Sequence, residues 1–198
     1  MLLAVGASPV AAQQPELIER TMAIVGGQAV TLSDARAALT FKLVDVGSSV
    51  DPEQTATARL VDRELMLREV RRYAPPTPSE AAIDARLSEI RKAFPAESFT
   101  RALEISGFTD ARLRAWVRDD LRTQAYLAQR FVSASTPTEL EIANAYAQQK
   151  AEFDRAGTTL AEATPMLRER LIAARRKELI ADWVADLRRR TDVILLVQ

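Results

Sequence analysis

The 198-residue sequence contains neither cysteine nor histidine. Without cysteine the chain has no disulfide, no thiol nucleophile and no thiolate that could bind a metal ion. Without histidine it has no Ser-His-Asp triad and no imidazole to carry protons near neutral pH. These two absences exclude a large part of common enzyme chemistry, and we expect no metal ion and no cofactor.

The sequence also has no excess of charge of either sign. Lysine and arginine number 27, aspartate and glutamate number 27, and the formal net charge is zero. A protein that binds nucleic acid non-specifically needs a surplus of positive charge to displace counterions from the phosphates. We therefore expect no nucleic-acid partner. The hydrophobic content of 47% is typical of a folded protein, and a chain of this length can bury a core.

No apolar run is long enough to cross a bilayer, which takes about 20 residues in a helix, so we expect no stable membrane insertion. Residues 1–12 (MLLAVGASPVAA) are nevertheless apolar and small. They end in Val10-Ala11-Ala12, and signal peptidase accepts small residues before its cut. We interpret residues 1–12 as a signal-peptide remnant that lacks its basic start, and residues 13–198 as an exported chain. The alternative is a frayed N-terminus.

Glycine is scarce, with six residues, and two of these are adjacent. Gly26-Gly27 separates the short β-prone runs at residues 21–25 and 28–31. A glycine pair between two such runs is typical of a tight hairpin. A phosphate-binding loop is disfavoured because no lysine or third glycine follows.

From residue 32 onward the hydrophobic spacing is that of amphipathic helices. We predict about seven helices, with core helices over about 32–133, the first reaching Val46, and return helices over about 137–190. Helix-start signals occur at Asp51-Pro52 and in three capping-box patterns. These patterns are Thr77–Glu80, Thr136–Glu139 and Thr159–Glu162.

The chain closes with the β-prone run at residues 193–197 (VILLV). A lone strand needs a partner, and the only other predicted strands lie at residues 21–31. We therefore predict a mainly α fold, forming a single domain, with a small sheet built from the N-terminal hairpin and the C-terminal strand.

The acidic residues show no pattern typical of a catalytic or metal site. Asp119 and Asp120 lie between arginines on a predicted helix, where a solvated and ion-paired face is the usual arrangement. Tyr73 and Tyr126 stand out among the aromatic residues. Tyr73 precedes Pro75-Pro76, and Tyr126 departs from the apolar stripe of its helix. Apolar surface beyond what a thin bundle can hide suggests a concave peptide-binding groove. Its candidate residues are Met66, Tyr73, Phe94, Phe108 and Tyr126.

Five segments follow one another in a recognisable order. They are residues 23–34 (AIVGGQAVTLSD), 60–70 (LVDRELMLREV), 77–84 (TPSEAAID), 99–109 and 113–121. This order resembles the SurA-type family of periplasmic chaperones and parvulin-type peptidyl-prolyl isomerases, and the similarity covers about residues 21–198. Residues 183–196 are similar to the closing segment of that family. The resemblance implies the helical chaperone domain found at the N-terminus of such proteins.

One departure from the family pattern bears on function. In the usual member, a helix like that at residues 138–153 leads into an isomerase domain, and a helix like that at 159–190 follows it. Here only residues 154–158 separate the two, and parvulin chemistry relies on histidine, which is absent. The resemblance therefore implies a chaperone scaffold without isomerase activity, and we expect no enzyme.

The function implied by the resemblance is ATP-independent binding of unfolded or extended polypeptides in the periplasm or cell envelope. Outer-membrane protein precursors are one candidate class of client, and a homodimer is left open. Two alternatives remain. The chain could be an assembly subunit that uses the same cradle as a fixed interface, with a single discrete partner instead of many clients. It could also be a carboxylate-based hydrolase, which mutation of the paired acids would inactivate.

Overall fold

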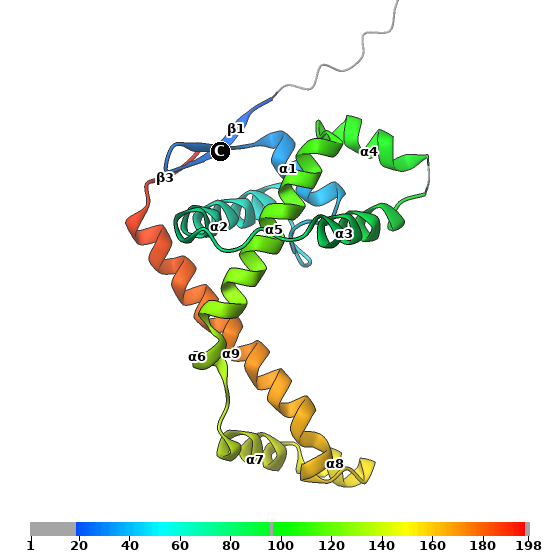
Figure 1. Cartoon of the computed structure of the whole chain (residues 1–198), viewed down its shortest axis with the longest axis vertical. Helices are drawn as coiled ribbons and strands as arrows, with labels where there is room; N and C mark the ends of the chain where they lie inside the picture. The colour runs from blue at the N-terminus through cyan, green and yellow to red at the C-terminus, as the bar shows by residue number, and fades with distance from the viewer. Residues whose placement is uncertain (1–18, 96, 197–198) are drawn as a thin grey trace, which may run out of the picture.

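The computed structural model describes residues 19–95 and 97–196, and these form a mainly helical protein with one small sheet, as predicted (Figure 1). The signal-peptide interpretation of residues 1–12 therefore lies outside the described residues, as does Val197. No helix in the described ranges is apolar over a stretch long enough to cross a membrane. The elements, in chain order, are β1 (Thr21–Val25), β2 (Gln28–Thr31), α1 (Leu32–Thr40), α2 (Pro52–Tyr73), α3 (Glu80–Lys92), α4 (Ser98–Ser106), α5 (Asp110–Arg130), α6 (Val132–Ser135), α7 (Glu139–Gln148), α8 (Lys150–Ala156), α9 (Leu160–Arg190) and β3 (Val193–Leu195).

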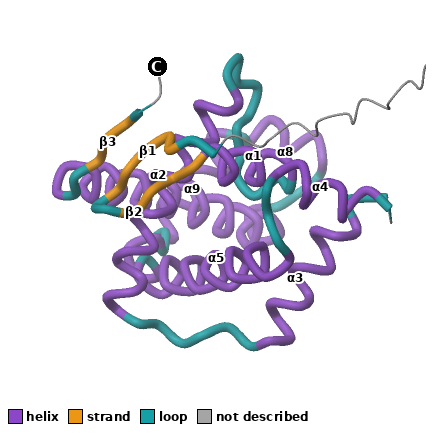
Figure 2. The backbone as a smooth tube through the Cα atoms, turned by 90° about the horizontal axis from the view of Figure 1, so that it is seen from above, coloured by secondary structure: helices purple, strands orange, loops and turns teal. Residues whose placement is uncertain are grey.

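The sheet joins the two ends of the described chain, which confirms the predicted topology. Its strand order is β2-β1-β3, and both pairings are antiparallel. Figure 2 shows the three strands side by side, with β3 at one edge. Gly26 and Gly27 form the hairpin turn with φ of 51° and 88°, values that glycine adopts without steric cost. The guanidinium of Arg68 donates to the carbonyl oxygen of Gly26 at 2.8 Å.

The sheet packs on α2 and on the C-terminal part of α9. Ala23 and Val25 of β1 share one apolar cluster with Leu65 of α2 and with Trp183 and Leu187 of α9. A second cluster fills the space between α1, α3, α4 and α5. Its buried members include Phe41, Ile83, Leu87, Phe108 and Leu113. We call this part of the molecule, residues 19–135 with 176–196, the head.

Residues 139–171 form the distal lobe, which Figure 1 shows at the far end of the molecule from the sheet. It contains α7, α8 and the start of α9, around a small cluster of Ile142, Ala163 and Leu167. The 31 residues of α9 extend over about 46 Å at 1.5 Å per residue. One helix thus carries side chains into the cores of both the head and the distal lobe.

Several helix boundaries differ from the sequence prediction. The first helix ends at Thr40 and not near Val46. Phe41 enters the second cluster, and Lys42 adopts a positive φ of 50°, so that the Leu43 N–H bonds to the Ala38 carbonyl. This is the left-handed helix ending that glycine usually provides. Because a lysine occupies the position here, the sequence carried no stop signal.

Two of the three capping-box patterns are displaced by two residues. The N-caps are Ser79 and Thr138, not Thr77 and Thr136. Thr138 and Glu141 make the reciprocal bonds of a capping box, whereas the Thr136 hydroxyl donates to the carbonyl of Val132. The box at Thr159 and Glu162 is confirmed.

The helix predicted to reach Phe153 is divided at Gln149 into α7 and α8, and the short α6 was not predicted. The division brings the rings of Tyr146 and Phe153 together in a stack at 4.9 Å. Packing within the distal lobe therefore sets this boundary, and no glycine or proline marks it in the sequence.

Candidate functional site

A cavity of about 430 Å³ opens where α2 ends and the C-terminal turns of α5 pass beside it. The chain leaves α2 through Ala74, which has a φ of 42°. Its N–H still bonds to the carbonyl of Val70, and the prolines that follow cannot continue the helix. The lining residues are Tyr73, Ala74, Pro75, Pro76, Tyr126, Gln129 and Arg130.

Two tyrosine rings form the aromatic wall of this cavity. Tyr73 lies on the last turn of α2 and is 57% exposed, whereas Tyr126 on α5 is only 8% exposed. Their ring centroids are 5.6 Å apart and the planes are inclined by 27°, which is a stacked arrangement. Tyr126 also contacts the ring of Trp183 on α9, with centroids 6.0 Å apart. The exposed ring therefore rests on a buried aromatic support instead of moving freely.

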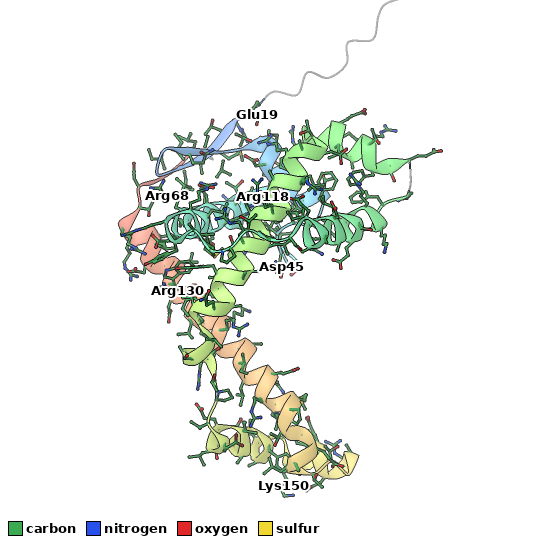
Figure 3. The ribbon with its side chains drawn as sticks, viewed as in Figure 1. Glu19, Asp45, Arg68, Arg118, Arg130 and Lys150 are labelled. Atoms are coloured by element: carbon green, nitrogen blue, oxygen red, sulfur yellow. The ribbon has the colours of Figure 1, made fainter. Side chains whose placement is uncertain are left out.

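Arg130 also lines the cavity and adds a positive charge. Its Nη1 donates to the hydroxyl oxygen of Tyr126 at 3.1 Å. The guanidinium carbon lies 5.9, 5.5 and 5.2 Å from the ring centroids of Tyr126, Phe131 and Trp183. No carboxylate in the described ranges forms an ion pair with it. Figure 3 labels Arg130 near the junction of α5 with α9. A cation held on aromatic faces, without an acidic partner, can receive a carbonyl or carboxylate group of a ligand.

The structure brings together two of the five predicted groove residues, Tyr73 and Tyr126, and places the others elsewhere. Met66 is half-buried against the first cluster. Phe94 packs between Phe41 and Phe99 and lines a separate cavity of about 250 Å³. Phe108 is buried in the second cluster, with the Arg112 guanidinium 4.6 Å from its ring centroid.

One groove containing all five residues is therefore not formed. The apolar spacing identified the buried stripe of each helix, but it did not tell which cluster each stripe enters. Pro75, Pro76 and Arg130 were not predicted as lining residues. The Tyr-Ala-Pro-Pro sequence at the end of a helix is the signal that could have located the cavity.

Asp120 is less solvated than the sequence predicted. Burial raises the pKa of its carboxyl group, and the nearby charges of Arg63 and Arg86 oppose this rise. Burial also lowers the pKa of Arg63, whose guanidinium carbon lies 4.4 Å from the ring centroid of Trp116. The positive charge of Arg63 on α2 and the negative charge of Asp120 on α5 thus stabilise each other. Within the described ranges, no group of three or more acidic side chains could hold a metal ion.

No protein-family model matches the chain, and no curated protein matches its sequence.

Proposed function

We propose that the protein binds unfolded or extended polypeptides without ATP, as a chaperone of the cell envelope, and that the cavity beside Tyr73 receives their side chains. The observation that carries this proposal is the exposed ring of Tyr73, stacked on Tyr126 next to Arg130. An exposed tyrosine offers a large apolar area and a polar end at a small cost in conformational entropy. Such a surface suits clients that differ in sequence.

The composition of the cavity supports a peptide ligand. Pro75 and Pro76 form a wall without backbone N–H groups, so this wall accepts apolar atoms without leaving a donor unpaired. The amide of Gln129 and the guanidinium of Arg130 can donate to the carbonyl groups that every polypeptide carries. Aromatic contact combined with backbone recognition gives broad specificity.

The connection between the return helices supports a scaffold without an isomerase domain. The structure places α8 and α9 only a few residues apart, with Gly157 at φ 66° in the turn. This turn cannot contain an inserted domain. We expect no turnover above background in a protease-coupled assay with a proline peptide, and catalysis in that assay would refute this part of the proposal.

The test compares Tyr73→Ser with Ile105→Ser in an aggregation-suppression assay with a urea-unfolded outer-membrane protein. Ile105 is 59% exposed on α4 and does not line the cavity, so it matches Tyr73 in exposure. We expect Tyr73→Ser to weaken suppression several-fold and Ile105→Ser to leave it unchanged. Equal suppression by both variants would refute the site.

Trp183 provides a direct readout because it contacts the supporting ring of Tyr126. In a Trp116→Phe background it is the single tryptophan of the chain. Titration with the unfolded client should change its emission, and Tyr73→Ser should move the midpoint to a higher client concentration.

The alternative function, an assembly subunit with one fixed partner, differs in its competition behaviour. Two unrelated unfolded proteins should compete for the cavity if the proposal is correct. A fixed interface would bind its single partner and would ignore both competitors.

A further inference from the structure

Among the residues that the structure describes, the outer edge of β3 has no strand partner. The Gly26 N–H bonds to the Asp192 carbonyl at 2.8 Å, and the Leu196 N–H bonds to the Met22 carbonyl at 2.9 Å. In an antiparallel pair, alternate residues direct their N–H and C=O groups to opposite sides. Since Asp192 and Leu196 face β1, the backbone groups of Val193 and Leu195 face away from the sheet.

Natural edge strands are protected by short length, charged side chains, proline, bulges or a covering element. β3 is short, with three residues, but it contains no charged side chain and no proline. β3 has the sequence Val-Ile-Leu, and the following Leu196 is also exposed. The opposite edge differs, because β2 begins with Gln28 and borders a cavity lined by Arg63 and Arg112.

A second cavity of about 430 Å³ lies directly beside the free edge. Leu195, which is 61% exposed, forms one side of it. The other lining residues lie on α2 and are Gln54, Thr55, Thr57, Ala58 and Arg59. Leu195 is opposite the buried Ala23, so both side chains point to the helical face of the sheet. In a strand added next to β3, every second side chain would point into this cavity.

Arg59 gives the cavity a positive charge. Its Nε donates to the carbonyl of Asp45 at 3.3 Å, and no carboxylate among the described side chains forms an ion pair with it. An acidic side chain in the added strand would complement this charge.

We propose that an extended segment of an unfolded protein, alternating in apolar residues and carrying an acidic residue, adds to β3 as a fourth strand. The backbone of Val193 and Leu195 holds the segment, the cavity takes an apolar side chain, and Arg59 pairs with the acid. This mode of peptide recognition is strand addition to a sheet edge. Strand addition at β3 and the proposed function concern the same class of ligand, an unfolded polypeptide. They use different surfaces, so binding at β3 can fail while binding at the cavity beside Tyr73 holds, and the reverse.

The experiment measures the fluorescence anisotropy of a labelled synthetic peptide in which valine and threonine alternate around one aspartate. The full chain should bind it, and the same peptide N-methylated at alternate residues should bind at least about tenfold more weakly, because its hydrogen bonds to β3 are lost. Equal binding of the two peptides would overturn the proposal.

Leu195→Pro removes one outward N–H at an edge position where proline is tolerated. It should weaken the peptide about tenfold without changing the melting temperature, whereas Tyr73→Ser should leave peptide binding unchanged. Weakening by Tyr73→Ser instead would assign the peptide to the other cavity and overturn the inference.

Arg59→Glu tests the proposal without touching the sheet. It should weaken the aspartate peptide and strengthen a matched lysine peptide, and an unchanged preference would overturn the assignment of Arg59. In sedimentation velocity, a concentration-dependent dimer that Leu195→Pro abolishes would identify the occupant as a second copy of this chain and would also overturn the proposal.

Discussion

The head and the distal lobe are held together by different forces, although one helix belongs to both. In the head, α9 buries Trp183, Val184 and Leu187 against the sheet and α2. In the distal lobe it buries only Ala163 and Leu167. Between these two regions α9 has no fully buried side chain. Two arginines of α9 form ion pairs with α7. Arg168 lies 2.6 Å from Glu139, and Arg175 pairs with Glu141.

The helix α9 therefore connects the two regions and buries more apolar surface at its head end than at its distal end. A helix without a buried stripe depends on its ends and on surface pairs for its position. Exposed ion pairs each contribute about 1 kcal/mol or less, whereas each fully buried large apolar side chain contributes about 1.5–3 kcal/mol. We therefore expect the head to set the global stability and the distal lobe to unfold locally first.

The largest effect should follow truncation after Arg155, which removes α9 and β3. In the head, α9 buries the side chains of Trp183, Val184 and Leu187. Each contributes about 1.5–3 kcal/mol, and the sum is comparable with a total stability of about 5–15 kcal/mol. We expect a product without cooperative thermal unfolding by circular dichroism.

The matched control for this truncation removes the distal lobe alone. The Thr136 carbonyl accepts a bond from Arg175 at 3.3 Å, so residues 137–174 can be replaced by a short Gly-Ser linker. This variant should keep a cooperative transition close to that of the full chain. A cooperative truncation at Arg155 would contradict the shared-sheet topology.

The next effect in size is that of Trp183→Ala. The ring contacts Tyr126 and Phe131 and is 7% exposed. Its loss should reduce the free energy of unfolding by about 3–5 kcal/mol, the range for large aromatic truncations in a core. Chemical denaturation measures this loss. A change below about 1 kcal/mol would show that the contact between α5 and α9 contributes little.

Leu167→Ala should have a smaller and local effect. Leu167 is buried, but its cluster has few other members. We expect a loss of about 2 kcal/mol, at the lower end for leucine truncation, because the small lobe can relax around the cavity. Hydrogen exchange should accelerate in residues 139–171 and remain unchanged in α2 and α5. Faster exchange throughout the head would contradict local unfolding.

How far the sequence predicted these two regions depends on where the stabilising contacts lie. The hairpin at Gly26-Gly27 and the box at Thr159 were predicted because each depends on local residue chemistry. The meeting of both chain ends was predicted because the C-terminal strand had no other predicted strand to pair with. The ends of α1 and α7 were not predicted, because packing of the buried Phe41 sets one end and packing of the partly buried Phe153 sets the other.

The candidate site could likewise be predicted only in part from the sequence. Tyr73 and Tyr126 were singled out by a proline signal and by a break in the apolar stripe, and the structure stacks them. Met66, Phe94 and Phe108 were chosen as part of the apolar surface that a thin bundle was not expected to hide. Their positions depend on long-range packing between helices, which a single sequence does not reveal.

The smallest predicted effect is an acid sensitivity of the distal lobe. The backbone N–H of Thr138, followed by Arg175 and the Thr138 hydroxyl, lowers the pKa of Glu141 from 4.5 to about 2. The backbone N–H and hydroxyl of Thr159 lower the pKa of Glu162 in the same way. A carboxylate with a lowered pKa in the folded state stabilises that state above its unfolded pKa. This contribution should therefore be complete above about pH 5 and should disappear as the pH falls from 4.5 towards 2.

Glu141→Gln tests this prediction because it removes the charge and keeps the shape of the side chain. Hydrogen exchange in α7 should be faster than in the unmodified chain at pH 6, and the difference should decrease on acidification, when Glu141 of the unmodified chain becomes protonated. Glu152→Gln is the matched control, since Glu152 is exposed on α8 and its side chain makes no hydrogen bond within the described ranges. Equal exchange in the two variants at pH 6 would show that apolar packing, and not the charged cap, holds the distal lobe to α9.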